Sequence, residues 1–180
     1  MDIYSLVVLF HVLGAVLGAG GSAVAEVQIT RALKDGTVSK DESYLMHANY
    51  TLIRIGMVLV ILSGIILILW NINIGNDWAL KSPKLWIKEI MMVVIIFNAY
   101  ALSKHWTPLW LGSAISLTSW WGATTIGVLN GMSYSFIQFL IGYIVAIGIV
   151  AIIISFVKKL AQDIKTLIKT LSNEIKRYSI

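Results

Sequence analysis

Four long stretches of this chain contain no Asp, Glu, Lys or Arg, and they limit its fold more than any other feature: residues 3–25, 55–76, 90–103 and 105–157. A helix needs roughly 20 mostly apolar residues to cross a bilayer, and its backbone satisfies its own hydrogen bonds there. Over the whole chain 58% of the residues are hydrophobic and 13% are charged, against about 25% charged in soluble domains. The sequence therefore predicts an all-α integral membrane protein.

The pattern predicts five transmembrane helices. Residues 105–157 are long enough for two spans, divided at a turn at Asn130-Gly131-Met132-Ser133. The stretch 90–103 covers only about 21 Å of a core of roughly 30 Å, so this span must also take in Trp86 to Glu89, which draws Lys88 and Glu89 to the membrane. The expected spans are residues 3–25, 52–74, 85–104, 108–130 and 134–157.

The basic residues predict the orientation. With the C-terminus in the cytoplasm, eleven of the 14 Lys and Arg residues lie inside, and only Lys81, Lys84 and Lys88 lie outside. We therefore expect an N-out, C-in protein of the cytoplasmic membrane, and we interpret the net charge of +5 as topology rather than nucleic-acid binding. Residues 158–180 form a basic amphipathic pattern, expected to be a separate helix on the anionic inner leaflet or against a partner subunit such as a second copy.

Local signals predict several helix ends. The first helix has no breaker before about Lys34 and continues beyond its span. Ser39 and Glu42 fit a capping box, which places the start of the second helix near Lys40. Ser82-Pro83 and Thr107-Pro108 are typical of the starts of the third and fourth spans.

His11 lies inside the first span, and a titratable side chain at membrane depth indicates a functional site. At 100° per residue, its helix face also carries Tyr4, Gly14 and Gly18. Small residues four apart allow another helix to pack closely, but they also leave room for a planar macrocycle beside the histidine. His11 is thus a candidate cofactor or metal ligand, or else a histidine that hydrogen-bonds a neighbouring helix.

The third span presents a polar face on which Lys88 is the first residue, followed by Met91, Asn98 and His105. Lys88 and His11 share the outer half of the predicted bilayer, so they are expected to meet across one site. The alternative for Lys88 is that it extends to the outer headgroups. At the inner boundary, His47 and His105 could build a second metal or haem site with Glu26 and Arg54, although histidines at helix ends are usually interfacial.

Several chemistries are excluded by what the sequence lacks. There is no cysteine, so disulfides, thiolate metal sites and iron–sulfur clusters are ruled out. No hydrolase elbow, P-loop, dinucleotide fingerprint or zinc-protease motif is present.

Three segments together resemble a known superfamily: Phe10-His11-Val12-Leu13-Gly14, Arg54-Ile55-Gly56 through Ser63-Gly64, and Leu85-Trp86-Ile87-Lys88. The first hundred residues are similar to the membrane superfamily that joins HemJ-type protoporphyrinogen oxidases with copper-resistance D (CopD-like) domains. The resemblance implies that His11 and Lys88 are associated with a b-type haem. HemJ proteins have a Trp and a Leu-Pro-Arg-Leu segment where this chain has Ala15 to Ala25, so haem binding is implied more directly than protoporphyrinogen oxidation.

Three functional hypotheses follow. The first is a haem-binding oxidoreductase or electron carrier, with His11 as an axial ligand, Lys88 as the second ligand or a propionate anchor, and a quinone or porphyrinogen as redox partner. The second is copper handling, because His11 with Met91 and Met92 offers soft ligands for Cu(I). The third is a scaffold without a cofactor.

Overall fold

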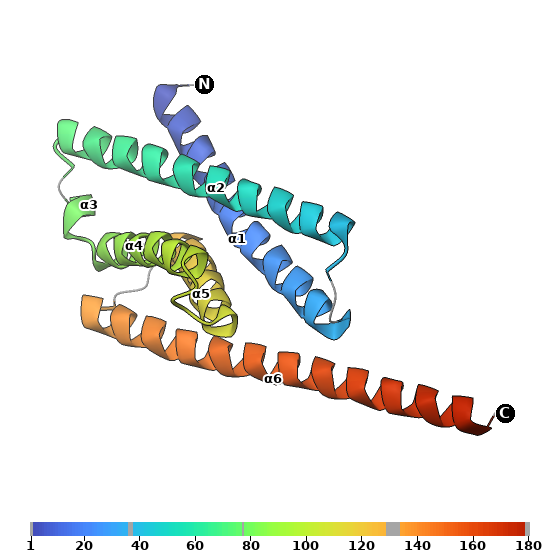
Figure 1. The fold of residues 1–180 in the computed structure, drawn as a ribbon. Coiled ribbons are helices and arrows are strands. Elements are labelled where there is room, and N and C mark those ends of the chain that lie inside the picture. Colours follow the sequence, from blue (N-terminus) through green and yellow to red (C-terminus); the bar gives the residue numbers. More distant parts are fainter. Residues whose placement is uncertain (1, 36–37, 77, 129–133, 179–180) are drawn as a thin grey trace.

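The computed structural model describes residues 2–35, 38–76, 78–128 and 134–178, and these residues contain helices and short connections but no strand. The expected all-α fold is confirmed (Figure 1). In chain order the helices are α1 (Ile3–Asp35), α2 (Lys40–Asn73), the single turn α3 (Trp78–Lys81), α4 (Pro83–Ser103), α5 (Leu109–Val128) and α6 (Phe136–Tyr178).

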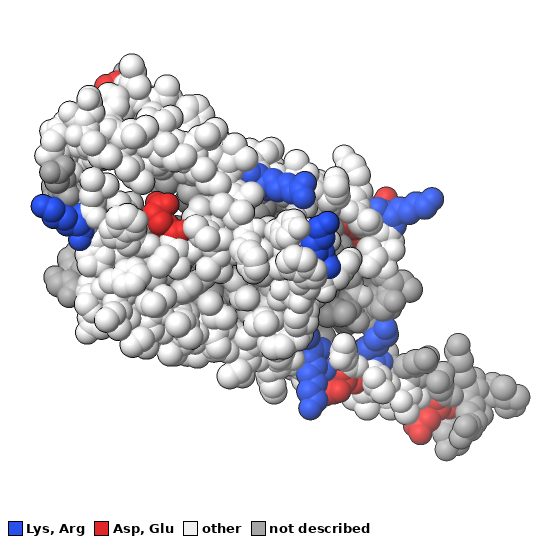
Figure 2. All heavy atoms as spheres, turned by 60° about the vertical axis from the view of Figure 1, so that its left-hand side comes forward, with Lys and Arg blue, Asp and Glu red and all other residues white. Residues whose placement is uncertain are grey.

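Within the described residues four helices are long and apolar enough to cross a membrane: α1 over Ile3–Ala32, α2, α4, and α6 over Phe136–Ile168. Many of their large apolar side chains are exposed, as lipid-facing residues are expected to be. On the face shown in Figure 2, uncharged atoms cover most of the surface, and the basic residues gather mainly toward its two ends. The protein is thus a multi-pass membrane protein, whereas a fifth crossing and the N-out, C-in orientation stay predictions.

Helix α5 is not among these four helices, and Ser, Thr and Gly recur along it. It lies among the other helices rather than at the edge of the bundle, and it contributes several fully covered residues. Small side chains suit that position because they let neighbouring helices approach. The buried residues of α5 are Gly112, Ala114, Thr118, Ser119 and Trp120.

The predicted helix ends are confirmed. The Ser39 side chain accepts from the backbone of Glu42, and the Glu42 carboxylate accepts from the Ser39 N–H at 2.9 Å, which completes the capping box at the start of α2. Helix α4 begins at Pro83 with Ser82 before it, α5 begins just after Pro108, and α1 runs to Asp35.

The C-terminal segment differs from the prediction. Helix α6 continues without a break past residue 158, so residues 158–178 belong to one helix of 43 residues, about 65 Å long. The helix has no break at residue 158, so the tail is not a separate helix, and its position on the inner leaflet stays a prediction (Figure 1). The turn predicted at residues 130–133 lies outside the described residues.

Helices α1 and α2 form a tight antiparallel hairpin. A Cβ on Gly14 would lie 2.8 Å from the carbonyl oxygen of Gly56, and a Cβ on Gly56 would lie 2.9 Å from the backbone nitrogen of Gly18. Asn49 donates to the carbonyl oxygen of Gly21 at 3.0 Å, which adds a polar tie at the end of the interface. The hairpin thus requires glycine at the points where the two backbones approach.

Trp120 joins this hairpin to the rest of the bundle. Its ring, which is 2% exposed, packs against Gly18 so closely that a Cβ there would overlap the six-membered ring. Polar ties hold α5 to its neighbours: Asn98 of α4 donates to Gly112 O at 2.7 Å, and Ser119 and Tyr143 of α6 are hydrogen-bonded at 2.6 Å. In contrast, no Cα of α4 comes within 8 Å of a Cα of α1 or α2 among the described residues.

We expect Gly18→Ala to lower the Tm of the detergent-purified protein, because the new methyl group must displace a rigid indole; overpacking of this kind costs about 1–3 kcal/mol. Gly20→Ala is the matched control, since a Cβ at Gly20 meets no atom within 4 Å. Equal melting temperatures for the two variants would contradict the packing described here.

Candidate functional site

Two cavities lie between the α1–α2 hairpin and α4. The first, here named the His11 cavity, has a volume of about 350 Å³ and is lined from α1, α2, α3, α4 and, through one residue, α5. Its polar side chains are His11, Asn71, Lys88 and Glu89, and the remaining walls are apolar except for Gly64. The apolar residues are Val60, Ile61, Ile65, Leu67, Ile68, Leu80, Leu85, Met92, Val93, Ile96 and Ala123.

The hydrogen bonds of Ser63 fix the protonation pattern of His11. The Ser63 hydroxyl donates to the carbonyl oxygen of Leu59 at 2.5 Å, with Val60 O at 3.3 Å. Because its single proton is used there, this oxygen accepts from His11 Nδ1 at 2.9 Å. The neutral imidazole therefore carries its proton on Nδ1 and leaves the Nε2 lone pair free. The sequence alone did not indicate this role of Ser63.

The structure brings His11 and Lys88 to the same cavity, His11 from α1 and Lys88 from α4. The expected meeting of these two residues is found, and their role as ligands stays a prediction. Gly64 forms the floor beside the imidazole: a Cβ there would lie 3.6 Å from His11 Cε1. Asn71, which the sequence did not single out, also lines the cavity, and its amide donates to Leu67 O at 2.8 Å.

Other predicted cofactor residues lie elsewhere. Tyr4 is 40% exposed, and its ring packs on Trp70 with the centroids 5.8 Å apart. Helix α2 fills the space beside Gly14, and Trp120 fills the space beside Gly18. The amide of Asn98 donates its hydrogen bond to α5. None of these four lines the His11 cavity, so close helix packing, not a macrocycle, occupies the glycine strip.

The predicted copper ligands point in different directions. Met92 lines the His11 cavity, but Met91 is 2% exposed and faces α5, where a Cβ on Gly122 would lie 3.2 Å from its Cε. Adjacent residues on a helix point about 100° apart, so one site cannot easily use both. Within the described residues no group of three or more His, Asp or Glu side chains is placed to hold a metal ion.

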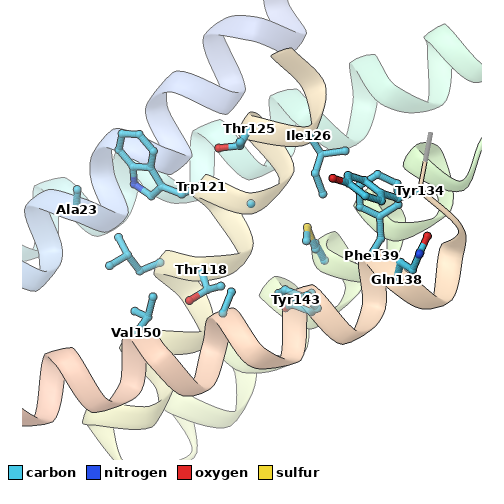
Figure 3. A pocket seen from close by; sticks show the side chains of 15 residues that line it. Ala23, Thr118, Trp121, Thr125, Ile126, Tyr134, Gln138, Phe139, Tyr143 and Val150 are labelled. Atoms are coloured by element: carbon cyan, nitrogen blue, oxygen red, sulfur yellow. The ribbon is translucent and has the colours of Figure 1, made fainter. Parts of the chain in front are cut away.

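Met91 instead lines an apolar cavity of about 870 Å³ bounded mainly by α5 and α6. In Figure 3, Trp121 and Thr125 of α5 and Tyr143 and Val150 of α6 lie around it, with Ala23 of α1 at one side. Its walls carry no charged side chain. This cavity therefore offers apolar contacts rather than ligands for a metal.

The second cavity between the α1–α2 hairpin and α4, here named the Glu26 cavity, lies toward the other end of the bundle and has a volume of about 800 Å³. Glu26, Arg54 and His105 line it, as the sequence suggested, but His47 does not: it is exposed on α2. His105 is also exposed and has a positive φ of 57° just after α4. The two histidines therefore do not line one cavity, and a second metal or haem site stays a prediction.

A largely buried ion pair borders the Glu26 cavity. Lys158 Nζ lies 3.0 Å from Glu26 Oε1, and the two side chains are 9% and 17% exposed. Lys158 also donates to the hydroxyl of Ser113 at 3.3 Å, so α1, α5 and α6 meet here. Sequence reasoning placed Lys158 in the solvated tail, and its position directly after an apolar run was the available signal.

We expect Lys158→Met to cost about 3–5 kcal/mol of stability, because it leaves the Glu26 carboxylate buried without a partner charge. Adding Glu26→Gln to that variant should restore most of the loss, and Lys159→Met, at the exposed neighbouring position, should change little. The measurement is thermal or denaturant unfolding in detergent. An equal loss from both single lysine variants would show that the pair does not stabilise the fold.

Comparison of the chain with protein-family models, curated proteins and solved structures finds no match. What the fold defines is a class, the multi-pass helical membrane proteins. The function is therefore inferred from the geometry of the His11 cavity and the Glu26 cavity.

Proposed function

We propose that this protein binds a b-type haem in the His11 cavity and acts as a membrane oxidoreductase or electron carrier. The observation that supports this most is the hydrogen bond between His11 Nδ1 and Ser63: with the Ser63 proton used on Leu59 O, Nδ1 is the donor and the lone pair of the imidazole is on Nε2, in a histidine that lines the cavity. A ring nitrogen held in this way is the usual form of a metal-ligating histidine.

The number of available ligands favours haem over a bare copper ion. Haem iron receives four nitrogens from its own macrocycle and needs one or two protein ligands, so His11 alone suffices. A bare Cu(I) site needs several soft ligands from the protein. Among the described residues that line this cavity, only His11 and Met92 could supply them. Bound in this way, the haem would supply one-electron redox chemistry, while the protein fixes its axial ligand and surroundings.

Lys88 is the second polar feature of the site. It lies on α4 and lines the same cavity as His11 of α1, where its neutral amine would serve as the second axial ligand or its ammonium form would hold a propionate. The apolar walls suit a macrocycle. A haem needs more room than 350 Å³, so the exposed rim residues Ile65 and Ile96 would have to turn outward to admit it.

We also propose where this site lies in the membrane. With five crossings and the N-terminus outside, the His11 cavity lies in the outer half of the cytoplasmic membrane. A lipid-soluble redox partner such as a quinone or porphyrinogen would then reach it from the bilayer.

We expect the purified protein, as isolated or after incubation with haemin, to show a Soret band that His11→Ala abolishes. Ser63→Ala removes the partner that orients the imidazole, and it should weaken haem affinity about 10- to 100-fold, as is usual when such an outer hydrogen bond is lost. His47→Ala and His105→Ala are the matched controls and should leave the spectrum unchanged.

Two results would contradict the haem proposal. One is a protein that stays colourless with haemin while keeping its fold. The other is stoichiometric copper binding without haem, lost in Met92→Leu but kept in Met91→Leu, which would favour copper handling instead.

A further inference from the structure

The Glu26 cavity has ionisable groups at one end, and most of its remaining surface is apolar. Glu26, Arg54 and His105 lie toward the end of the bundle that carries the α1–α2 connection. The rest of the lining combines apolar side chains, among them Met57 and Ile95, with several serine hydroxyls. A cavity of this form fits an amphiphile, with its head at the polar end and its chain inside.

Arg54 gives the polar end an uncompensated positive charge. Its guanidinium lies over the Tyr50 ring at 4.3 Å and donates to the Tyr50 hydroxyl at 3.3 Å. In the described part of the chain no carboxylate lies within 4 Å of it, and the only acidic residue lining the cavity, Glu26, is paired with Lys158. Arg54 therefore has donors left for an anion.

Two buried polar atoms of the lining side chains lack partners among the described residues: Trp120 Nε1, a donor, and Glu26 Oε2, an acceptor. The six-membered edge of the indole faces Gly18, so Nε1 lies on the side away from α1. Less than 1 Å² of each atom is accessible, so a ligand reaches them only when the side chains that cover them move aside. Unpaired buried groups are costly, and a ligand that pairs them gains affinity.

We propose that the Glu26 cavity binds one anionic phospholipid with a hydroxylated head group, of the phosphatidylglycerol class. The phosphate pairs with Arg54, a head-group hydroxyl donates to Glu26 Oε2, an ester carbonyl accepts from Trp120 Nε1, and an acyl chain lies along the apolar wall. A choline head group lacks a hydroxyl donor for Glu26, and its quaternary ammonium is repelled by Arg54. Basic pockets between membrane helices are known to hold anionic lipids in this way.

The test is native mass spectrometry of the full chain in detergent, with phosphatidylglycerol and phosphatidylcholine of identical acyl chains added in equal amounts. We expect one phosphatidylglycerol per chain, bound at least about fivefold more tightly, the effect of one lost buried polar contact. Arg54→Gln should abolish the preference. Arg31→Gln, which removes an exposed arginine that does not line the cavity, should keep it.

Equal binding of the two lipids, or an equal loss of preference in both arginine variants, would overturn the proposal. Inorganic phosphate supplies a further arm: if it displaces the lipid at millimolar concentration, the site recognises a free anion rather than a lipid.

The role of Trp120 is tested separately. Trp120→Phe should weaken phosphatidylglycerol binding about 5- to 100-fold, while Trp121→Phe, its neighbour on the wall of another cavity, should not. If Trp120→Phe fails to fold, the wild-type protein answers the same question with an ether-linked phosphatidylglycerol, which lacks the ester carbonyls. Full affinity for the ether lipid would overturn the assigned contact.

Discussion

The contact between Gly18 and Trp120 is the interaction on which the arrangement of the cavities depends. The α1–α2 hairpin is held by close backbone approaches at Gly14 and Gly56, and the indole then joins this hairpin to α5. Helix α4 packs on α5, and its backbone stays more than 8 Å from that of α2 in the described residues, so the two helices meet only through side chains around Trp120. The space between α2 and α4 is thus a consequence of packing elsewhere, and both the His11 cavity and the Glu26 cavity lie along it.

The lipid surroundings explain why the polar side chains in this bundle come in ordered pairs. Ser63 accepts from His11, Asn98 donates to Gly112, and Lys158 binds Glu26. Each pair offsets the cost of removing polar atoms from water. The atoms that remain unpaired in the described residues, such as Trp120 Nε1, are few, and for that reason they are informative about where a ligand can bind.

Sequence reasoning was most successful where a local rule applies. The capping box at Ser39 and the proline at the start of α4 depend only on neighbouring residues. The prediction that Lys88 belongs to the third span needs only the length of the apolar stretch after it and the thickness of a bilayer. Sequence reasoning failed where the partner lies far away in the chain: nothing near Gly18 shows that Trp120 fills its groove. The amphipathic pattern after residue 158 is equally compatible with a helix lying flat and with one that continues α6, so it could not decide between them.

The continuity of α6 makes the tail and the span a single rod. The direction of the tail is therefore not independent of the tilt of the span, and a molecule that reorients the tail must either tilt the span or bend the helix. Lys158 lies on this rod at the level of its bond to Glu26. A force applied to the tail beyond the bundle is therefore transmitted to the ion pair between Lys158 and Glu26, which connects α6 to α1.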